Sequence, residues 1–214
     1  MKFNNETIRE AVKEWCEDQK SALNKYGDIN EWDTSEVTDM SSLFEGRDFF
    51  NSPIDKWDVS NVTNMKEMFA SYSFNQPIGN WDVSSVTNME SMFKGAAKFY
   101  QPLDNWDVSN VTTMDCMFKG ATVFNKPLNN WNVSNVESME SVFNGARNFN
   151  GDLSSWDVSN VVDMRFMFDD SRFNQPLDNW DVSNVRTMYC MFAGCDRFNQ
   201  PLNNWDVSKV LNMA

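Results

Sequence analysis

The sequence predicts an α/β repeat solenoid in which each repeat contributes one short parallel strand and one short helix or 3₁₀ turn. Three observations lead to this class. Tryptophan recurs at a near-constant interval, several apolar residues keep fixed places between successive tryptophans, and the apolar spacing changes within each interval. Such self-similarity is typical of repeat proteins, in which each unit packs on its neighbours. We therefore expect one solenoid domain over residues 32–214, preceded by a capping helix in residues 1–31.

Each repeat begins at a tryptophan, and successive tryptophans lie 25 residues apart, or 24 in two cases. We number the positions of a repeat from its tryptophan, which is position 0. Position 5 is Val and position 8 is Met in all repeats, and position 12 is Phe in every full repeat, which predicts a continuous core of stacked columns. Seven full repeats and one partial repeat begin at Trp32, Trp57, Trp81, Trp106, Trp131, Trp156, Trp180 and Trp205.

The spacing of apolar residues within one repeat predicts where its strand and helix lie. The segment Leu103–Ser109 alternates apolar and polar residues around its tryptophan, which is typical of a strand. The apolar residues from Val111 to Phe118 then follow at intervals of three, three and one, as on one face of a helix or 3₁₀ turn. Gly120 is expected to end this element in the left-handed conformation.

Residues 1–31 lack the repeat and are predicted to form a helix that covers the first repeat. The sequence Thr7-Ile8-Arg9-Glu10 fits a capping box, and Gly27 is expected to end the helix. Its predicted apolar stripe consists of Ile8, Val12, Trp15, Ala22 and Leu23.

The repeat Asn-Trp-Asp-Val-Ser-Asn-Val-Thr-x-Met-x-x-Met-Phe resembles that of the BspA-like leucine-rich-repeat surface proteins, from Trp32 to Met213. The resemblance implies a leucine-rich-repeat-like right-handed superhelix with a strand-lined face, used in adhesion or protein–protein contact. It brings no catalytic residues. It also implies a location at the cell surface or in a virion, whereas the sequence itself shows neither a signal peptide nor a transmembrane segment.

The composition disfavours several classes of function. A net charge of −13 opposes binding to nucleic acid, which needs clustered Lys and Arg, and no apolar stretch is long enough for membrane insertion. With no histidine, Ser-His-Asp and Cys-His arrangements and His-ligated metals are excluded. Cys116 and Cys190 share a column three repeats apart, too far for a disulfide. We expect neither an enzyme nor a cofactor.

Position 1 carries an acidic ladder, interrupted once by Asn132. One interpretation is structural: each carboxylate accepts hydrogen bonds from the Ser two residues on or from turn amides, which offsets the repulsion between neighbouring charges. The other is functional, with the ladder serving Ca²⁺ or a basic partner. We favour the structural interpretation. The ladder consists of Asp33, Asp58, Asp82, Asp107, Asp157, Asp181 and Asp206.

A second candidate site lies in the repeats that begin at Trp156 and Trp180. They carry Arg, Val and aromatic residues at positions where the other repeats carry mostly Thr, Ser, Glu or Lys. Arg and aromatic residues there match the composition of binding hot spots. The alternative is drift on a solvated face. The candidate contact residues are Val162, Arg165, Phe166, Arg172, Arg186, Tyr189 and Arg197.

The preferred function is therefore a non-catalytic binding or scaffold module that contacts another protein. The alternatives are a structural component of a virion or cell-surface assembly, and a calcium-binding acidic ladder. The partial repeat after Trp205 has no Phe at position 12, so the apolar residues beneath it are expected to be only half covered. We expect either that the native chain continues beyond residue 214, or that this end is covered by another protein or by another copy, for example in a two-fold dimer.

Overall fold

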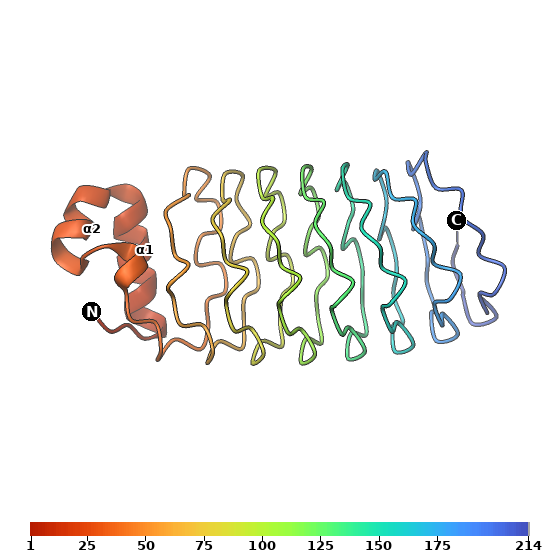
Figure 1. The fold of residues 1–214 in the computed structure, drawn as a ribbon, viewed down its shortest axis with the longest axis horizontal. Coiled ribbons are helices and arrows are strands. Elements are labelled where there is room, and N and C mark those ends of the chain that lie inside the picture. The colour runs from red at the N-terminus through yellow and green to blue at the C-terminus, as the bar shows by residue number, and fades with distance from the viewer. Residues whose placement is uncertain (214) are drawn as a thin grey trace.

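A computed structural model describes residues 1–213 and shows a stack of irregular coils, one for each repeat, with helices at the N-terminal end (Figure 1). Helix α1 spans Asn5–Glu17, α2 spans Gln19–Tyr26, and the 3₁₀ helix η1 spans Ile29–Glu31. The predicted repeat fold and its helical N-terminal cover are thus confirmed. Each interior coil lies between two others, as the column pattern requires.

The strand predicted for each repeat is wrong, and the stretch predicted as a short helix or 3₁₀ turn forms separate hydrogen-bonded turns and no helix. Among residues 1–213 there is no strand, and the only helices are α1, α2 and η1. Neighbouring coils are joined instead by isolated parallel bridges at position 7, such as those of Thr113 with Asn88 and with Ser138. The segment Leu103–Ser109, predicted as the strand, has no bridge.

Consecutive tight turns occupy the stretch in which a helix was predicted. The amide of Met117 donates to the carbonyl of Met114 at 3.0 Å, and the same three-residue step recurs at positions 13 and 15. Cys116 and Gly120 both have positive φ, 58° and 72°, which a helix does not contain. The left-handed Gly120 was predicted correctly. A chain of turns that advances by threes buries residues at nearly helical spacing, which explains the error.

The core consists of side-chain columns that run through the whole stack. Phe118 and Phe143, from adjacent coils, are fully buried with their ring centroids 5.7 Å apart. Trp106 and Trp131 stack at 6.4 Å, nearly parallel. Each indole also binds the backbone of the coil before it: Nε1 of Trp131 donates to the carbonyl of Leu103 at 2.9 Å. The tryptophan columns therefore supply both apolar burial and a buried hydrogen bond in each coil.

The N-terminal cover differs in detail from the prediction. Helix α1 begins at a capping box formed by Asn4 and Thr7, not at the predicted Thr7-Ile8-Arg9-Glu10, and a second helix follows it. Trp15 of α1 packs edge-on against Trp32, with ring centroids 5.8 Å apart, so the helix does cover the first coil. Leu23 belongs to the predicted stripe but is 47% exposed, because α2 turns it away from the core.

Candidate functional site

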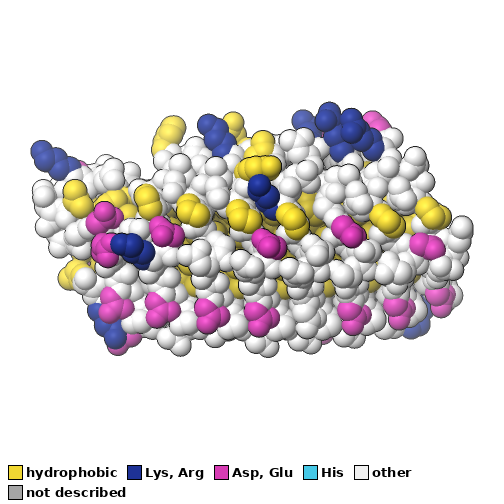
Figure 2. Space-filling model, in the orientation of Figure 1, with side chains coloured by type: hydrophobic (Ala, Val, Ile, Leu, Met, Phe, Trp, Pro, Cys, Tyr) yellow, Lys and Arg dark blue, Asp and Glu magenta, His cyan; other side chains and the backbone are white. Residues whose placement is uncertain are grey.

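The acidic ladder is held by the turn that follows each tryptophan. In the Trp81 coil, Oδ1 of Asp82 accepts from the amide of Ser84 at 3.1 Å and from its hydroxyl at 2.6 Å. The amide contact recurs in every coil, at 3.0–3.1 Å, and Asn132 makes it where the ladder has no acid. Figure 2 shows acidic side chains in a regularly spaced row along one edge of the stack. These are the hydrogen bonds expected if the ladder has a structural role.

Electrostatics fit the same role. The hydroxyl and amide of Ser84 hold the pKa of Asp82 below its usual range, although the neighbouring Asp107 carboxylate acts in the opposite direction. Ser109 lowers the pKa of Asp107 in the same way. Among residues 1–213, no three Asp, Glu or Cys side chains converge as a metal site. The lowered pKa values of Asp82 and Asp107 thus come from partners in their own coil.

Five of the seven predicted contact residues stand at positions 6, 9 and 10 of two adjacent coils. Phe166 and Tyr189 meet edge to face, with ring centroids 5.3 Å apart. The amide of Arg186 donates to the carbonyl of Val162 at 2.9 Å, so these two residues are neighbours in adjacent coils. Val162 and Tyr189 are 38% and 37% exposed. We call Val162, Phe166, Arg186 and Tyr189 the side surface.

Arg165, the fifth residue, already forms ion pairs within the chain. Its guanidinium forms ion pairs with Glu140 and with Asp163, each at 2.7 Å. These two carboxylates raise the pKa of Arg165, the hydrogen bond to Asp163 being the larger cause. Arg165 therefore stabilises the edge of the side surface and is not a free cation for a partner.

Arg172 and Arg197 lie apart from the side surface, on the loops that connect positions 14 to 19. They line a shallow groove of about 330 Å³ that Tyr100 and Val123 also border, and none of the other five predicted residues borders it. No ion pair joins either guanidinium to a carboxylate within the described residues. Figure 2 shows Lys and Arg side chains gathered at this edge near the C-terminal end. The seven predicted residues thus form two surfaces rather than one patch.

Two features of these surfaces were not predicted. Phe166 has a φ of 56°, a left-handed conformation that is unusual for a bulky residue. Position 10 is left-handed in all full repeats, but other coils place Ser, Cys or Glu there. Leu211, 83% exposed, extends the side surface by one coil, because its amide donates to the carbonyl of Arg186 at 2.8 Å. Column comparison singled out Phe166 by its residue type, but the residues alone did not indicate its left-handed backbone.

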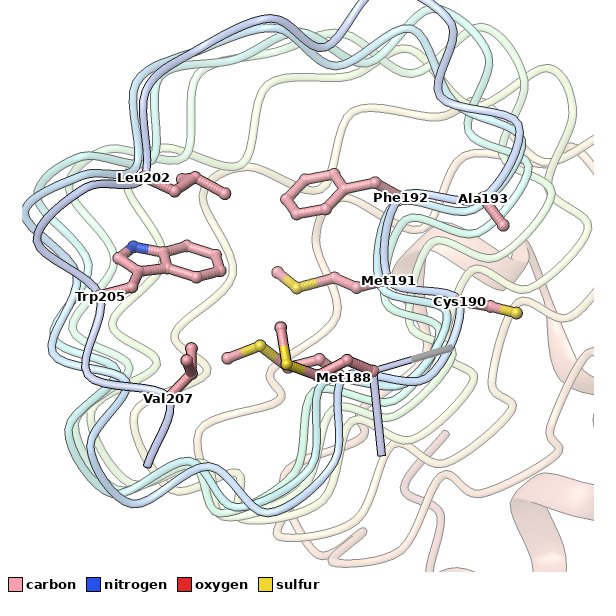
Figure 3. Close-up of a pocket in the computed structure, with 9 residues that line it drawn as sticks. Met188, Cys190, Met191, Phe192, Ala193, Leu202, Trp205 and Val207 are labelled. Carbon is pink, nitrogen blue, oxygen red and sulfur yellow. The ribbon is translucent and has the colours of Figure 1, made fainter. Parts of the chain in front are cut away.

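The C-terminal end of the stack contains an apolar cavity of about 470 Å³ (Figure 3). Met188, Met191 and Phe192 line one side, and Trp205 and Val207 face them from the last coil. Phe192 is only half-buried, whereas the same column is fully buried in the coils before it. Of the three residues expected to be half covered, Phe192 is so, whereas Met188 and Met191 are buried, at 5% and 3% exposed.

The thiols show no sign of activation. All four cysteines are free, and burial raises the pKa values of Cys16, Cys116 and Cys195 above that of an ordinary thiol. A nucleophilic cysteine needs the opposite shift, towards the thiolate. In residues 1–213, no helix is long and apolar enough to cross a membrane.

Stacked coils with continuous side-chain columns, tight turns and a helical N-terminal cover define the chain as a repeat protein. Residues 10–131 and 123–214 match the model of a family described as "Mycoplasma protein of unknown function, DUF285". The chain belongs to this family, in two tandem copies of its model. No curated protein and no solved structure gives a significant match.

Proposed function

We propose that the chain is a non-catalytic binding module that contacts another protein through the side surface of Val162, Phe166, Arg186 and Tyr189. The observation that carries this proposal is the backbone of Phe166, with a φ of 56°. Left-handed backbone at a bulky residue costs free energy, and such strain clusters at functional sites. The coils at Ser42, Ser91 and Ser141 make the same turn with a small polar residue.

The composition of the side surface supports this role. An aromatic pair, an exposed Val and an exposed Arg stand within four residues of one another along two adjacent coils, and aromatic residues and Arg are enriched in interface hot spots. The resemblance to BspA-like leucine-rich-repeat surface proteins agrees with it, and on that resemblance we assign the coils to a leucine-rich-repeat-like right-handed superhelix. A surface or virion location follows from the same resemblance.

The test compares three proteins: the wild type, the double variant Phe166→Ser with Tyr189→Ser, and the control Phe49→Ser. Phe49 is 98% exposed but lies near the N-terminal end, outside the side surface. Proteins cross-linked from the source cells should be shared by the wild type and the control and lost from the double variant. The double variant should unfold at the same denaturant concentration or a higher one, because Ser suits this turn. Equal capture by all three proteins would contradict the proposal.

A structural role in a virion or cell-surface assembly is the main alternative. It predicts that the purified chain forms regular oligomers through the side surface or the C-terminal cavity, with no second protein needed. Sedimentation of the same three proteins separates the two: self-assembly lost in the double variant favours the structural role. The calcium alternative predicts a melting temperature several degrees higher with calcium than with chelator.

A further inference from the structure

A row of buried phenylalanines in the connecting loops holds the neighbouring side chains at the surface. Phe124, Phe149 and Phe173 are fully buried, and their ring centroids follow one another from coil to coil at 6.0 and 6.2 Å. The residues directly before and after each of these rings lie at the surface, as side chains alternate in extended backbone. Such residues line the groove of about 330 Å³ that contains Arg172 and Arg197.

The lining of this groove contains no carboxylate. Its side chains are those of Arg172 and Arg197, three asparagines, Tyr100 and Val123, all of which belong to complete repeats. In a chain of net charge −13, a groove with cations and no acid differs from the rest of the surface. Figure 2 shows Lys and Arg side chains gathered at this edge, away from the rows of acidic side chains.

The two guanidiniums are available to a ligand. Arg172 and Arg197 are exposed, and no carboxylate of the described residues pairs with either. Asp170 and Asp196 border the neighbouring hollow, but Arg147 already binds Asp170 at 2.6 Å. Each free guanidinium offers a planar fork of N–H donors, which suits a carboxylate.

The asparagines add further donors to the groove. The side-chain oxygen of Asn125 accepts from the amide of Asn150 at 3.0 Å, and that of Asn150 accepts from the amide of Asn174 at 2.7 Å. The Nδ2 groups of Asn125 and Asn150 meet no acceptor in residues 1–213, and the Asn148 side chain makes no hydrogen bond there. The occupant of this groove therefore has to supply acceptors and negative charge.

We propose that this groove binds an extended acidic peptide segment of a partner protein, with carboxylates at alternate residues. Side chains on one face of an extended chain repeat every ~6.6–6.8 Å. The rings of Phe173 and Phe198, which directly follow Arg172 and Arg197, lie 6.3 Å apart. Two alternate acids thus match the spacing of the two guanidiniums, and the peptide groups between them match the Asn side chains, which also donate and accept.

This site goes beyond the proposed function. The side surface of Val162, Phe166, Arg186 and Tyr189 contributes no residue to the groove. Either proposal can therefore fail alone.

Three other occupants fit the groove less well. A nucleic acid strand would meet the aspartates of the neighbouring hollow, including Asp170 and Asp196. A saccharide that stacks on Tyr100 would compete with Lys126, whose Nζ lies 3.5 Å from the ring centroid. A second copy would bring another net charge of −13 to the same surface.

The test uses the intact chain and two synthetic peptides of equal composition and charge. The probe is acetyl-Gly-Asp-Thr-Asp-Thr-Asp-Gly-amide, and the control is acetyl-Gly-Thr-Thr-Asp-Asp-Asp-Gly-amide. The arginine Nε–H signals of the protein are followed by NMR at about 20 mM salt, where charge attraction is little screened. We expect the probe to shift the signals of Arg172 and Arg197 saturably and to bind at least about fivefold more tightly than the control.

Two protein variants locate the binding. Arg172→Gln with Arg197→Gln should weaken probe binding about tenfold or more, because both carboxylate contacts are lost. Lys13→Gln with Arg186→Gln removes the same charge from exposed residues outside the groove and should change the affinity by less than about twofold. Both variants should keep the melting temperature of the wild type, because all four residues are exposed.

Each other outcome overturns the proposal. Equal affinity of the two variants would show general charge attraction, and equal affinity for the two peptides would show that the spacing of the acids is not read. Tighter binding of trigalacturonate than of the probe would identify an acidic saccharide as the ligand. Shifts that depend on protein concentration without peptide, with a dimer mass in sedimentation, would identify a second copy. No shift of either arginine at about 5 mM probe would show that the groove binds no acidic peptide.

Discussion

The first coil and the interior coils satisfy their backbone groups differently. At the N-terminal end, side chains of α1 do so: the guanidinium of Arg9 donates to the carbonyl of Ser41 at 2.6 Å, and the side-chain oxygen of Asn5 accepts from the amide of Thr38 at 2.8 Å. In the interior the neighbouring backbone does so: the amide of Phe118 donates to the next coil at 2.9 Å, and the amide of Thr112 donates to the coil before it at 2.9 Å. The difference teaches that a cover for such a stack must supply both a donor and an acceptor, because each coil offers both kinds of group to its neighbour.

The largest expected effect is the loss of stability when a position-12 Phe is truncated, and this loss should be greater in the interior than in the last coils. Phe118→Ala should lower the free energy of unfolding by ~3–5 kcal/mol, because a fully buried ring leaves a cavity. Phe192→Ala removes a half-buried ring from the same column and should cost roughly half as much. Denaturant unfolding followed by tryptophan fluorescence measures both. Equal losses would mean that the last coils are packed as tightly as the interior.

The stability of the N-terminal end should depend on the charge of Arg9. Arg9→Met keeps most of the packing but removes the donors to Ser41 and Asp39, and should cost about 1–2 kcal/mol. Arg197→Met, a control near the other end, should change stability by less than about 0.5 kcal/mol, because Arg197 is exposed. Thermal and denaturant unfolding of both variants give the comparison. Unchanged stability of Arg9→Met would show that the carbonyls of Ser41 and Asp39 need no cation.

A smaller effect is expected at position 14, where the backbone is left-handed in both Gly120 and Asp170, with φ of 72° and 51°. Gly120→Ala should cost about 1 kcal/mol, since a Cβ is disfavoured there. Asp170→Gly should gain a few tenths of a kcal/mol, the relief of backbone strain exceeding the loss of the exposed ion pair with Arg147. Calorimetry of the two variants should find shifts of opposite sign. Two shifts of the same sign would disprove this interpretation of the column.

The smallest expected effect concerns the pH dependence of stability at Asp82 and Asp107 of the acidic ladder. Hydrogen bonds from Ser84 and Ser109 lower the pKa values of Asp82 and Asp107 in the folded protein. Their stabilising contribution is therefore present above the ordinary Asp pKa of ~3.9 and is lost as pH falls through the lowered values. The double variant Ser84→Ala with Ser109→Ala should lose less melting temperature than the wild type between about pH 6 and pH 3. Identical pH profiles would contradict a structural ladder.

The sequence was sufficient to predict the columns and the repeat boundaries, because Trp106, Met114 and Phe118 recur in register and each must be buried against its neighbour. It misplaced the local structure. Consecutive turns bury residues at nearly helical spacing, and the left-handed position 10 carries Ser, Glu, Cys or Phe, so no glycine marked it. The alternation around Trp106 looked like a strand, but its burial comes from indole stacking and not from a ladder of backbone bonds.

The candidate site was predicted only in part. Column comparison found Phe166 and Tyr189 as departures from the repeat, and the structure brings them together. It also grouped Arg172 with them, because a column alignment does not tell which side of a coil a loop residue faces. The columns of backbone hydrogen bonds at positions 10 and 12 were not predicted, because the direction of a peptide group depends on φ and ψ and leaves no pattern in the residues.

The central claim, that columns of backbone hydrogen bonds join each coil to the next, is tested most directly by hydrogen exchange. The amides of Phe69, Phe118 and Phe168 each donate to the next coil and should exchange only through opening of the stack. The amide of Asp107 makes no hydrogen bond within residues 1–213 and should exchange at least about a hundredfold faster than that of Phe118 at equal intrinsic rate. Equal protection of these two amides would contradict the account.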